Sequence, residues 1–131
     1  MGTTWQAAPV RRLTDAELDA YDHVPRAVAA RARLVRVPVL VNGADGVTID
    51  RFVLLRRDDP ADRTGHRELL AHELVHAAQW SELGLVRFGW RYLAAYARNR
   101  RRRMGHEQAY LAIPFEEQAR QDAAAWAASH P

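Results

Sequence analysis

Residues 72–76 have the sequence His-Glu-Leu-Val-His, within a segment whose apolar residues recur at helical spacing. On a helix, positions four apart lie about 40° apart around the axis and roughly 6 Å apart along it, so both imidazoles can face one ion. Zinc binds imidazole nitrogen at about 2.0–2.1 Å. Glu73 directly follows the first histidine, where it can take a proton from coordinated water without binding the metal. The pattern predicts zinc held by His72 and His76, with Glu73 as general base.

A catalytic zinc site usually takes three protein ligands and leaves one position for water. The chain has no cysteine, so the third ligand must be a histidine or a carboxylate. The downstream candidates are Glu116, Glu117 and His106. Gln79 stands where the metzincin and aspzincin continuations place a glycine, which argues against both arrangements.

Two segments together resemble the gluzincins, the zinc hydrolases whose third ligand is a glutamate on a later helix. They are residues 72–76 and residues 113–119, and the second has the sequence Ile-Pro-Phe-Glu-Glu-Gln-Ala with a Glu-x-x-Ala motif. Matched by position, the resemblance implies that Glu116 is the third ligand and that Ala119 allows close packing against the metal-binding helix. It also implies a minimal zincin-like fold, in which an edge strand formed by residues 47–56 lines the cleft.

The resemblance departs from the family pattern at one position. Many gluzincins carry an aspartate four residues after the third ligand, where it orients a zinc-binding histidine, and this chain has Arg120 there. The orienting group is therefore unassigned, and Glu117 stays open as the ligand, with Gln121 as its orienting partner.

The reaction expected of such a site is attack of water on a polarised carbonyl. Glu73 would accept the proton of the water and pass it to the leaving amine. A hydrogen-bond donor must stabilise the oxyanion. We favour Tyr110 for this role, because it lies just before the glutamate helix, and Tyr92, Tyr96 and His106 remain alternatives. The resemblance implies a peptide or protein substrate, which makes the chain a zinc metallopeptidase.

The elements that would position these residues follow from sequence period and capping signals. Thr14 and Glu17 form a capping box that opens a short helix ending near residue 23. A β-branched, partly alternating pattern predicts a strand over residues 34–41, and residues 47–56 are interpreted as the return strand, joined to it by turn residues as a hairpin. Pro38 argues for an edge position or a bulge in the first strand. The remaining predicted helices span residues 25–32, 67–83, 86–102 and 114–129.

These elements predict a helix-rich α+β fold of the zincin type. A small N-terminal sheet would pack on the active-site helix, and a C-terminal helix would carry the glutamate. Residues 1–13 lack periodicity and are interpreted as a flexible N-terminal arm, and residues 14–131 as one domain. The 131 residues, 48% of them apolar and 27% charged, suit one globular domain.

Composition also bears on location and partners. No apolar stretch reaches the roughly 18 residues of a membrane span, and the N-terminus lacks a signal-peptide pattern, so a cytoplasmic location is expected. The net charge is +3, all 19 basic residues are arginine, and residues 98–103 carry a run of them. We interpret this run as a solvated helix end and not as a nucleic-acid contact.

Two alternative functions stay open: a catalytically silent zinc-binding interaction module, and an arginine-rich nucleic-acid-binding protein with a structural metal.

Overall fold

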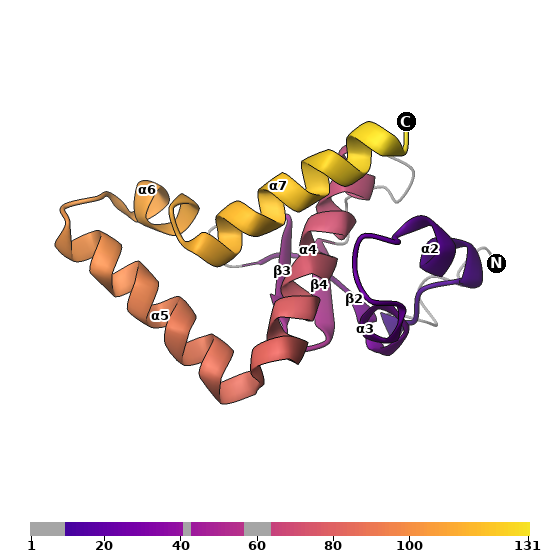
Figure 1. Cartoon of the computed structure of the whole chain (residues 1–131), viewed down its shortest axis with the longest axis horizontal. Helices are drawn as coiled ribbons and strands as arrows, with labels where there is room; N and C mark the ends of the chain where they lie inside the picture. The colour runs from indigo at the N-terminus through magenta and orange to yellow at the C-terminus, as the bar shows by residue number, and fades with distance from the viewer. Residues whose placement is uncertain (1–9, 41–42, 57–63) are drawn as a thin grey trace.

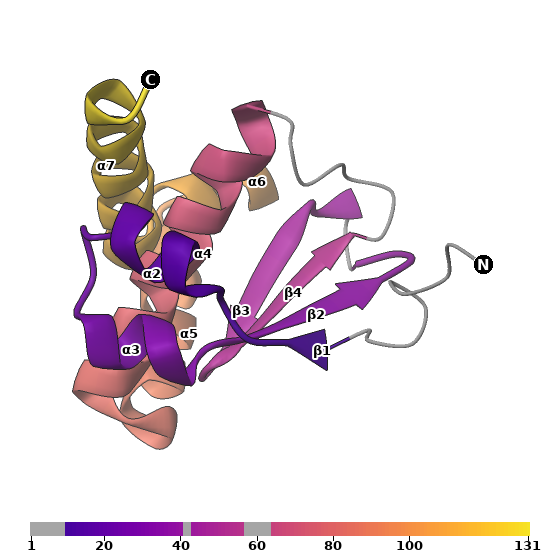
Figure 2. The same cartoon turned by 90° about the vertical axis from the view of Figure 1, so that its right-hand side faces the viewer.

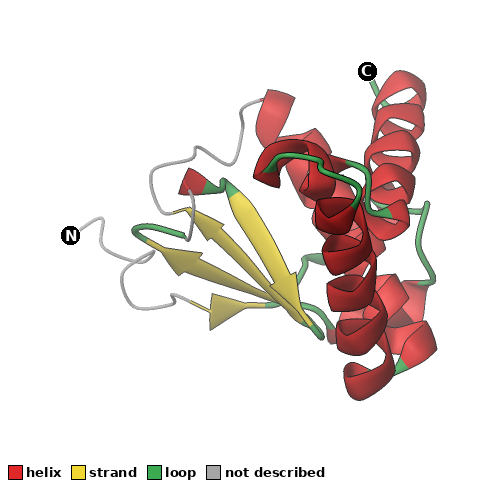
Figure 3. Cartoon of the chain, turned by 90° about the vertical axis from the view of Figure 1, so that its left-hand side faces the viewer, coloured by secondary structure: helices red, strands yellow, loops and turns green. Residues whose placement is uncertain are grey.

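The computed structural model describes residues 10–40, 43–56 and 64–131, with side chains from residue 67 in the last range. It is a helix-rich α+β fold in which a small sheet forms one layer and the helices gather on one side of it (Figures 2 and 3). In chain order the elements are β1 Val10–Arg11, α2 Asp15–Ala20, α3 Arg26–Arg31, β2 Arg33–Val37, β3 Gly46–Ile49, β4 Phe52–Arg56, α4 Thr64–Leu83, α5 Leu85–Arg101, α6 His106–Leu111 and α7 Pro114–Ser129.

The sheet is mixed, and its strand order is β1-β2-β4-β3. The predicted hairpin between residues 34–41 and 47–56 is wrong, because the second segment is itself two strands. It reverses at Asp50, whose φ of 57° permits a tight turn, and β4 returns antiparallel to β3. β4 then lies parallel to β2, in the middle of the sheet, where it buries Val53 and Leu55 completely. β2 ends at Val37, so Pro38 follows the strand.

The N-terminal segment joins the packed domain earlier than Thr14. Residues 1–9 of the predicted flexible arm lie outside the described residues. Val10 and Arg11 form β1, which pairs antiparallel with β2, and Leu13 is buried in the core. The capping box is confirmed, since Thr14 accepts from the backbone of Glu17 and the Glu17 side chain accepts from the backbone of Thr14.

Helices α4 and α7 make the main contact of the helical layer and pack side by side (Figure 1). Both begin and end close to the predicted positions. Leu70 and Leu74 of α4 are fully buried, and Ala119 and Ala123 of α7 lie against the same core. Ala119, for which close packing against α4 is predicted, is completely buried in this core. Near the C-terminus, Trp126 stacks on Tyr21 and ties α7 to the N-terminal helices.

Helix α5 diverges from α4 and α6 brings the chain back to α7 (Figure 1). The sequence predicts a break near residues 104–106 but not the short helix α6 that follows it. Asn99 of α5 is buried and donates to the carbonyl of Ala109 at 2.9 Å, which joins α5 to α6. This return places the first turn of α7, with Glu116, against the middle of α4.

Candidate metal centre

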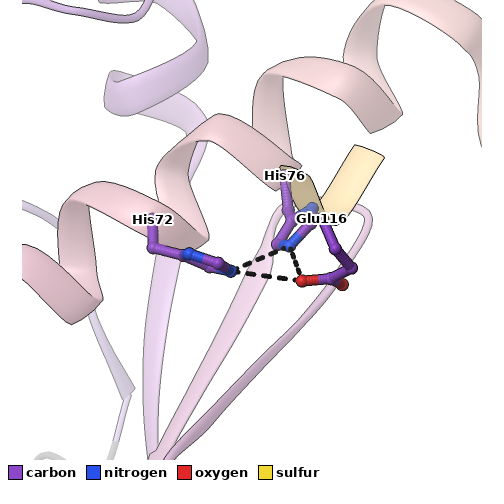
Figure 4. A group of neighbouring side chains, drawn as sticks. All are labelled: His72, His76 and Glu116. Carbon is purple, nitrogen blue, oxygen red and sulfur yellow. Dashed lines mark hydrogen bonds and ion pairs between the residues drawn. The ribbon is translucent and has the colours of Figure 1, made fainter. Parts of the chain in front are cut away.

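Three side chains from two helices meet at one point (Figure 4). His72 and His76 lie one turn apart on α4, and Glu116 reaches them from the first turn of α7. The two Nε2 atoms are 3.2 Å apart. Oε1 of Glu116 lies 3.3 Å from Nε2 of His72 and 3.2 Å from Nε2 of His76. This group of two imidazoles and a carboxylate could hold a metal ion.

The tautomer of His76 follows from its contact with Gln79. Nε2 of Gln79 donates to the carbonyl of Phe115 at 3.1 Å and to Oε1 of Gln118 at 2.9 Å, which fixes the orientation of the amide. Oε1 of Gln79 then faces Nδ1 of His76 at 2.8 Å and must accept from it. In the neutral ring the proton therefore sits on Nδ1, and Nε2 presents its lone pair to the centre.

The donor set and its spacing fit a tetrahedral ion. Oε1 of Glu116 is buried and has no hydrogen-bond partner, although it faces both imidazoles. Ligand atoms about 2.0–2.1 Å from a tetrahedral zinc ion would lie about 3.3–3.4 Å from one another. The separations of 3.2–3.3 Å among the three atoms are close to this value. A cation at this point would satisfy the orphaned oxygen and the Nε2 lone pair of His76, and His72 offers its own Nε2 lone pair in the tautomer that is protonated at Nδ1.

The charges around the group favour a cation. Burial alone would raise the pKa of Glu116, but the nearby imidazoles and the hydrogen bond from Tyr92 outweigh it and hold that pKa below its ordinary value. Burial opposes the charged form of His76, yet the carboxylate of Glu116 raises the pKa of this histidine. Tyr92 on α5 donates to Oε2 of Glu116 at 2.8 Å, which leaves Oε1 directed at the imidazoles.

The side chain of Glu73 extends from α4 to the edge strand β3. Its side chain is 4% exposed, and Oε1 accepts from Oγ1 of Thr48 at 2.7 Å. A Cβ atom at Gly46 would lie 3.3 Å from Cγ and Oε2 of Glu73, so the glycine allows the strand to approach the carboxylate. Burial raises the pKa of Glu73, and the neighbouring imidazoles of His76 and His72 oppose this rise.

The other predicted site residues lie elsewhere, with one exception. Glu117 is exposed, and Nδ1 of His106 pairs with the hydroxyl of Tyr96 at 2.8 Å, so neither belongs to the group. The exception is Tyr110, which is 39% exposed and senses Glu116: partial burial and then the charge of Glu116 raise the pKa of its hydroxyl group. Arg120 donates to the carbonyl of Leu111 and does not orient a histidine.

Sequence reasoning missed two residues of the centre. The spacing of three residues between His76 and Gln79 on one predicted helix could have indicated their contact. Thr48 carried no signal, because its contact with Glu73 depends on how the strand docks against α4.

One protein-family model matches the chain, the eCIS core domain, over residues 40–84. These are 45 of the 131 residues, and the matched segment contains β3, β4 and α4 with both histidines and Glu73, but not Glu116. No curated protein and no solved structure matches the chain. Among the described residues, no helix combines the length and apolar character needed to cross a bilayer.

Proposed function

We propose that this chain is a zinc-dependent hydrolase of the gluzincin type and that it cleaves peptide bonds. The observation that carries the proposal is the spacing of the three ligand atoms. Nε2 of His72, Nε2 of His76 and Oε1 of Glu116 lie 3.2–3.3 Å apart, and the oxygen is buried without a hydrogen bond. A glutamate on a later helix that meets two histidines four residues apart is the ligand set expected from the gluzincin resemblance.

The donor types support zinc as the ion. Two imidazoles and one carboxylate form a common ligand set of catalytic zinc sites, which keep a fourth position for water or substrate. The side chain of His72 is 18% exposed, whereas those of His76 and Glu116 are 7% and 5% exposed. The centre therefore opens to solvent on the side of His72, where a substrate would enter.

Bound zinc would supply Lewis acidity, which lowers the pKa of a coordinated water from 15.7 to roughly 7. The residues of the chain have separate tasks around it. Glu73 would accept a proton and return it to the leaving amine, while Thr48 holds its Oε1 and leaves Oε2 for proton transfer. Tyr92 holds Glu116 in place as a ligand. Tyr110 is the candidate donor to the oxyanion.

A silent zinc-binding module would need the same three ligands but would not need Glu73. The position of Glu73 favours catalysis. Burial of a carboxylate costs free energy of folding, and a titratable group that is kept buried beside two histidines is typical of a functional site. Its hydrogen bond to Thr48 lowers that cost without removing it.

The test compares wild type with Glu73→Gln and Glu82→Gln, all loaded with zinc. Glu82 is an exposed residue of the same helix and serves as the matched control. The substrate is a pool of unfolded proteins, and new amino termini are counted by mass spectrometry. We expect cleavage by wild type and Glu82→Gln, and a loss of roughly a hundredfold or more in Glu73→Gln. Cleavage that persists in Glu73→Gln would rule out Glu73 as the base. Absence of cleavage by zinc-loaded wild type would favour the silent module.

A further inference from the structure

The outer face of α5 carries an exposed apolar stripe. Val86, Trp90 and Leu93 are 82%, 73% and 63% exposed, and their spacing places them on one side of the helix. Ala97 continues the same side one turn later and is exposed as well. The opposite side faces the protein, where Phe88 and Asn99 are buried and Tyr92 reaches Glu116. The stripe is therefore held outward by contacts made behind it.

Arginines border the stripe, and acidic residues are absent from this part of the chain. Between Gly84 and Arg103 the sequence contains no aspartate or glutamate. At 100° per residue, Arg100 falls on one side of the stripe and Arg87, Arg98 and Arg101 fall on the other. Within the described part of the chain, no ion pair joins these arginines to a carboxylate. A partner that covered this face would need to supply both negative charge and an apolar layer.

We propose that α5 docks on the surface of an anionic lipid bilayer. With the stripe facing down, Trp90 and Leu93 enter the boundary between headgroups and acyl chains, and the arginines on either side meet the lipid phosphates. The helix lies in the plane of the surface, because it is too polar to cross the bilayer. Figure 1 shows α5 diverging from the sheet and from α2 and α3, as a helix at the edge of the molecule.

Other occupants fit these observations less well. A second copy of the chain would bring two arginine-bordered stripes together, and like charges would oppose the contact. Nucleic acid would satisfy the arginines but would leave Val86 and Leu93 with no apolar partner. An anionic bilayer supplies negative charge for the arginines and an apolar layer for the stripe.

The test is flotation of the full chain with phosphatidylcholine vesicles, with and without phosphatidylserine. We expect binding only to the vesicles with phosphatidylserine, and weaker binding as salt increases. Arg98→Gln/Arg101→Gln should weaken binding by about fivefold for each charge removed. Trp90→Ser/Leu93→Ser should weaken it about tenfold or more. Arg31→Gln and Val39→Ser change exposed residues elsewhere and should bind like wild type.

Two results would overturn the proposal. The first is no binding to phosphatidylserine vesicles at low salt, and the second is binding that Trp90→Ser/Leu93→Ser leaves unchanged. If vesicles do not bind, salt-sensitive DNA binding would assign the face to nucleic acid, and a dimer that Trp90→Ser/Leu93→Ser abolishes would assign it to a second copy. Circular dichroism of each variant checks that the helices are intact.

Discussion

Gln79 and His76 share a hydrogen bond of 2.8 Å between Oε1 and Nδ1, and the Gln79 amide is held by Phe115 and Gln118 of α7. Helix α7 thus carries one candidate ligand, Glu116, and orients another, His76, through Gln79. We predict that Gln79→Leu lowers zinc affinity by roughly 10–100-fold, although all three ligands remain. Competition with a chromogenic chelator measures the affinity. Gln121→Leu, which makes the same change at an exposed glutamine of α7, is the control. Equal affinity in wild type and Gln79→Leu would show that the contact does not tune the ligand.

The two tyrosines near Glu116 should have separable effects. Tyr92 donates to Oε2 of Glu116 at 2.8 Å, so we predict that Tyr92→Phe weakens zinc binding by about tenfold. Tyr110 is the proposed oxyanion donor, so Tyr110→Phe should lower kcat by roughly tenfold or more while zinc affinity changes little. Chelator competition and steady-state kinetics on the same preparations separate the two. If Tyr110→Phe instead weakened zinc binding and Tyr92→Phe lowered kcat, Tyr92 would be the oxyanion donor and Tyr110 the residue that holds Glu116.

Thr48 positions Glu73 from the edge strand. Thr48→Val keeps the shape of the side chain and removes the hydrogen bond of 2.7 Å to Oε1 of Glu73. We predict a fall in kcat of roughly tenfold or more with full zinc content, because a hydrogen bond to a charged group contributes about 1.5–3 kcal/mol. Thr48→Ser retains the hydroxyl and should recover most of the rate. A Thr48→Val variant with unchanged kcat would mean that packing alone holds Glu73.

The sequence predicted the helices better than the sheet. Helical period, the capping box at Thr14 and Pro114 at the start of α7 are local signals, and each element they predicted is present. Strand pairing is not local. Residues 47–56 carry no Gly or Pro at the turn, where Asp50 adopts a positive φ, so the sequence alone did not show that this segment would form two strands with β4 between β2 and β3.

In the candidate site, too, local relationships could be predicted from the sequence, whereas contacts that depend on tertiary packing could not. His72 and His76 could be paired from their spacing on one helix, and Glu116 was reached through a resemblance to a known motif. Choosing Glu116 over its neighbour Glu117 needed the angle at which α7 meets α4, because one residue corresponds to about 100° around the helix. The contact between Thr48 and Glu73 likewise depends on the docking of β3 against α4.

Glu17 should make stability depend on pH. Burial alone would raise its pKa, but hydrogen bonds from Arg11 and Thr14 outweigh burial and lower it below the ordinary value of 4.5. Its stabilising effect is therefore present above pH 4.5 and is lost as pH falls through the lowered pKa. We predict that Glu17→Gln lowers the free energy of unfolding by roughly 1 kcal/mol at neutral pH.

Urea titrations of wild type and Glu17→Gln at neutral and acidic pH test this prediction. The difference between the two proteins should shrink as the carboxyl group of the wild type becomes protonated. Asp15→Asn, which changes an exposed carboxylate in the same turn, is the control. A difference that is constant with pH would mean that the side chain acts through packing and not through its charge.

The central claim is that His72, His76 and Glu116 hold one zinc ion. Elemental analysis of purified wild type, His76→Ala, Glu116→Ala and Glu117→Ala tests it most directly, with Glu117 as the exposed neighbour of the ligand. The predicted result is about one zinc per chain in wild type and in Glu117→Ala, and loss of zinc in the other two variants. Wild type that stays free of zinc when zinc is supplied, or Glu116→Ala that retains it, would contradict the account.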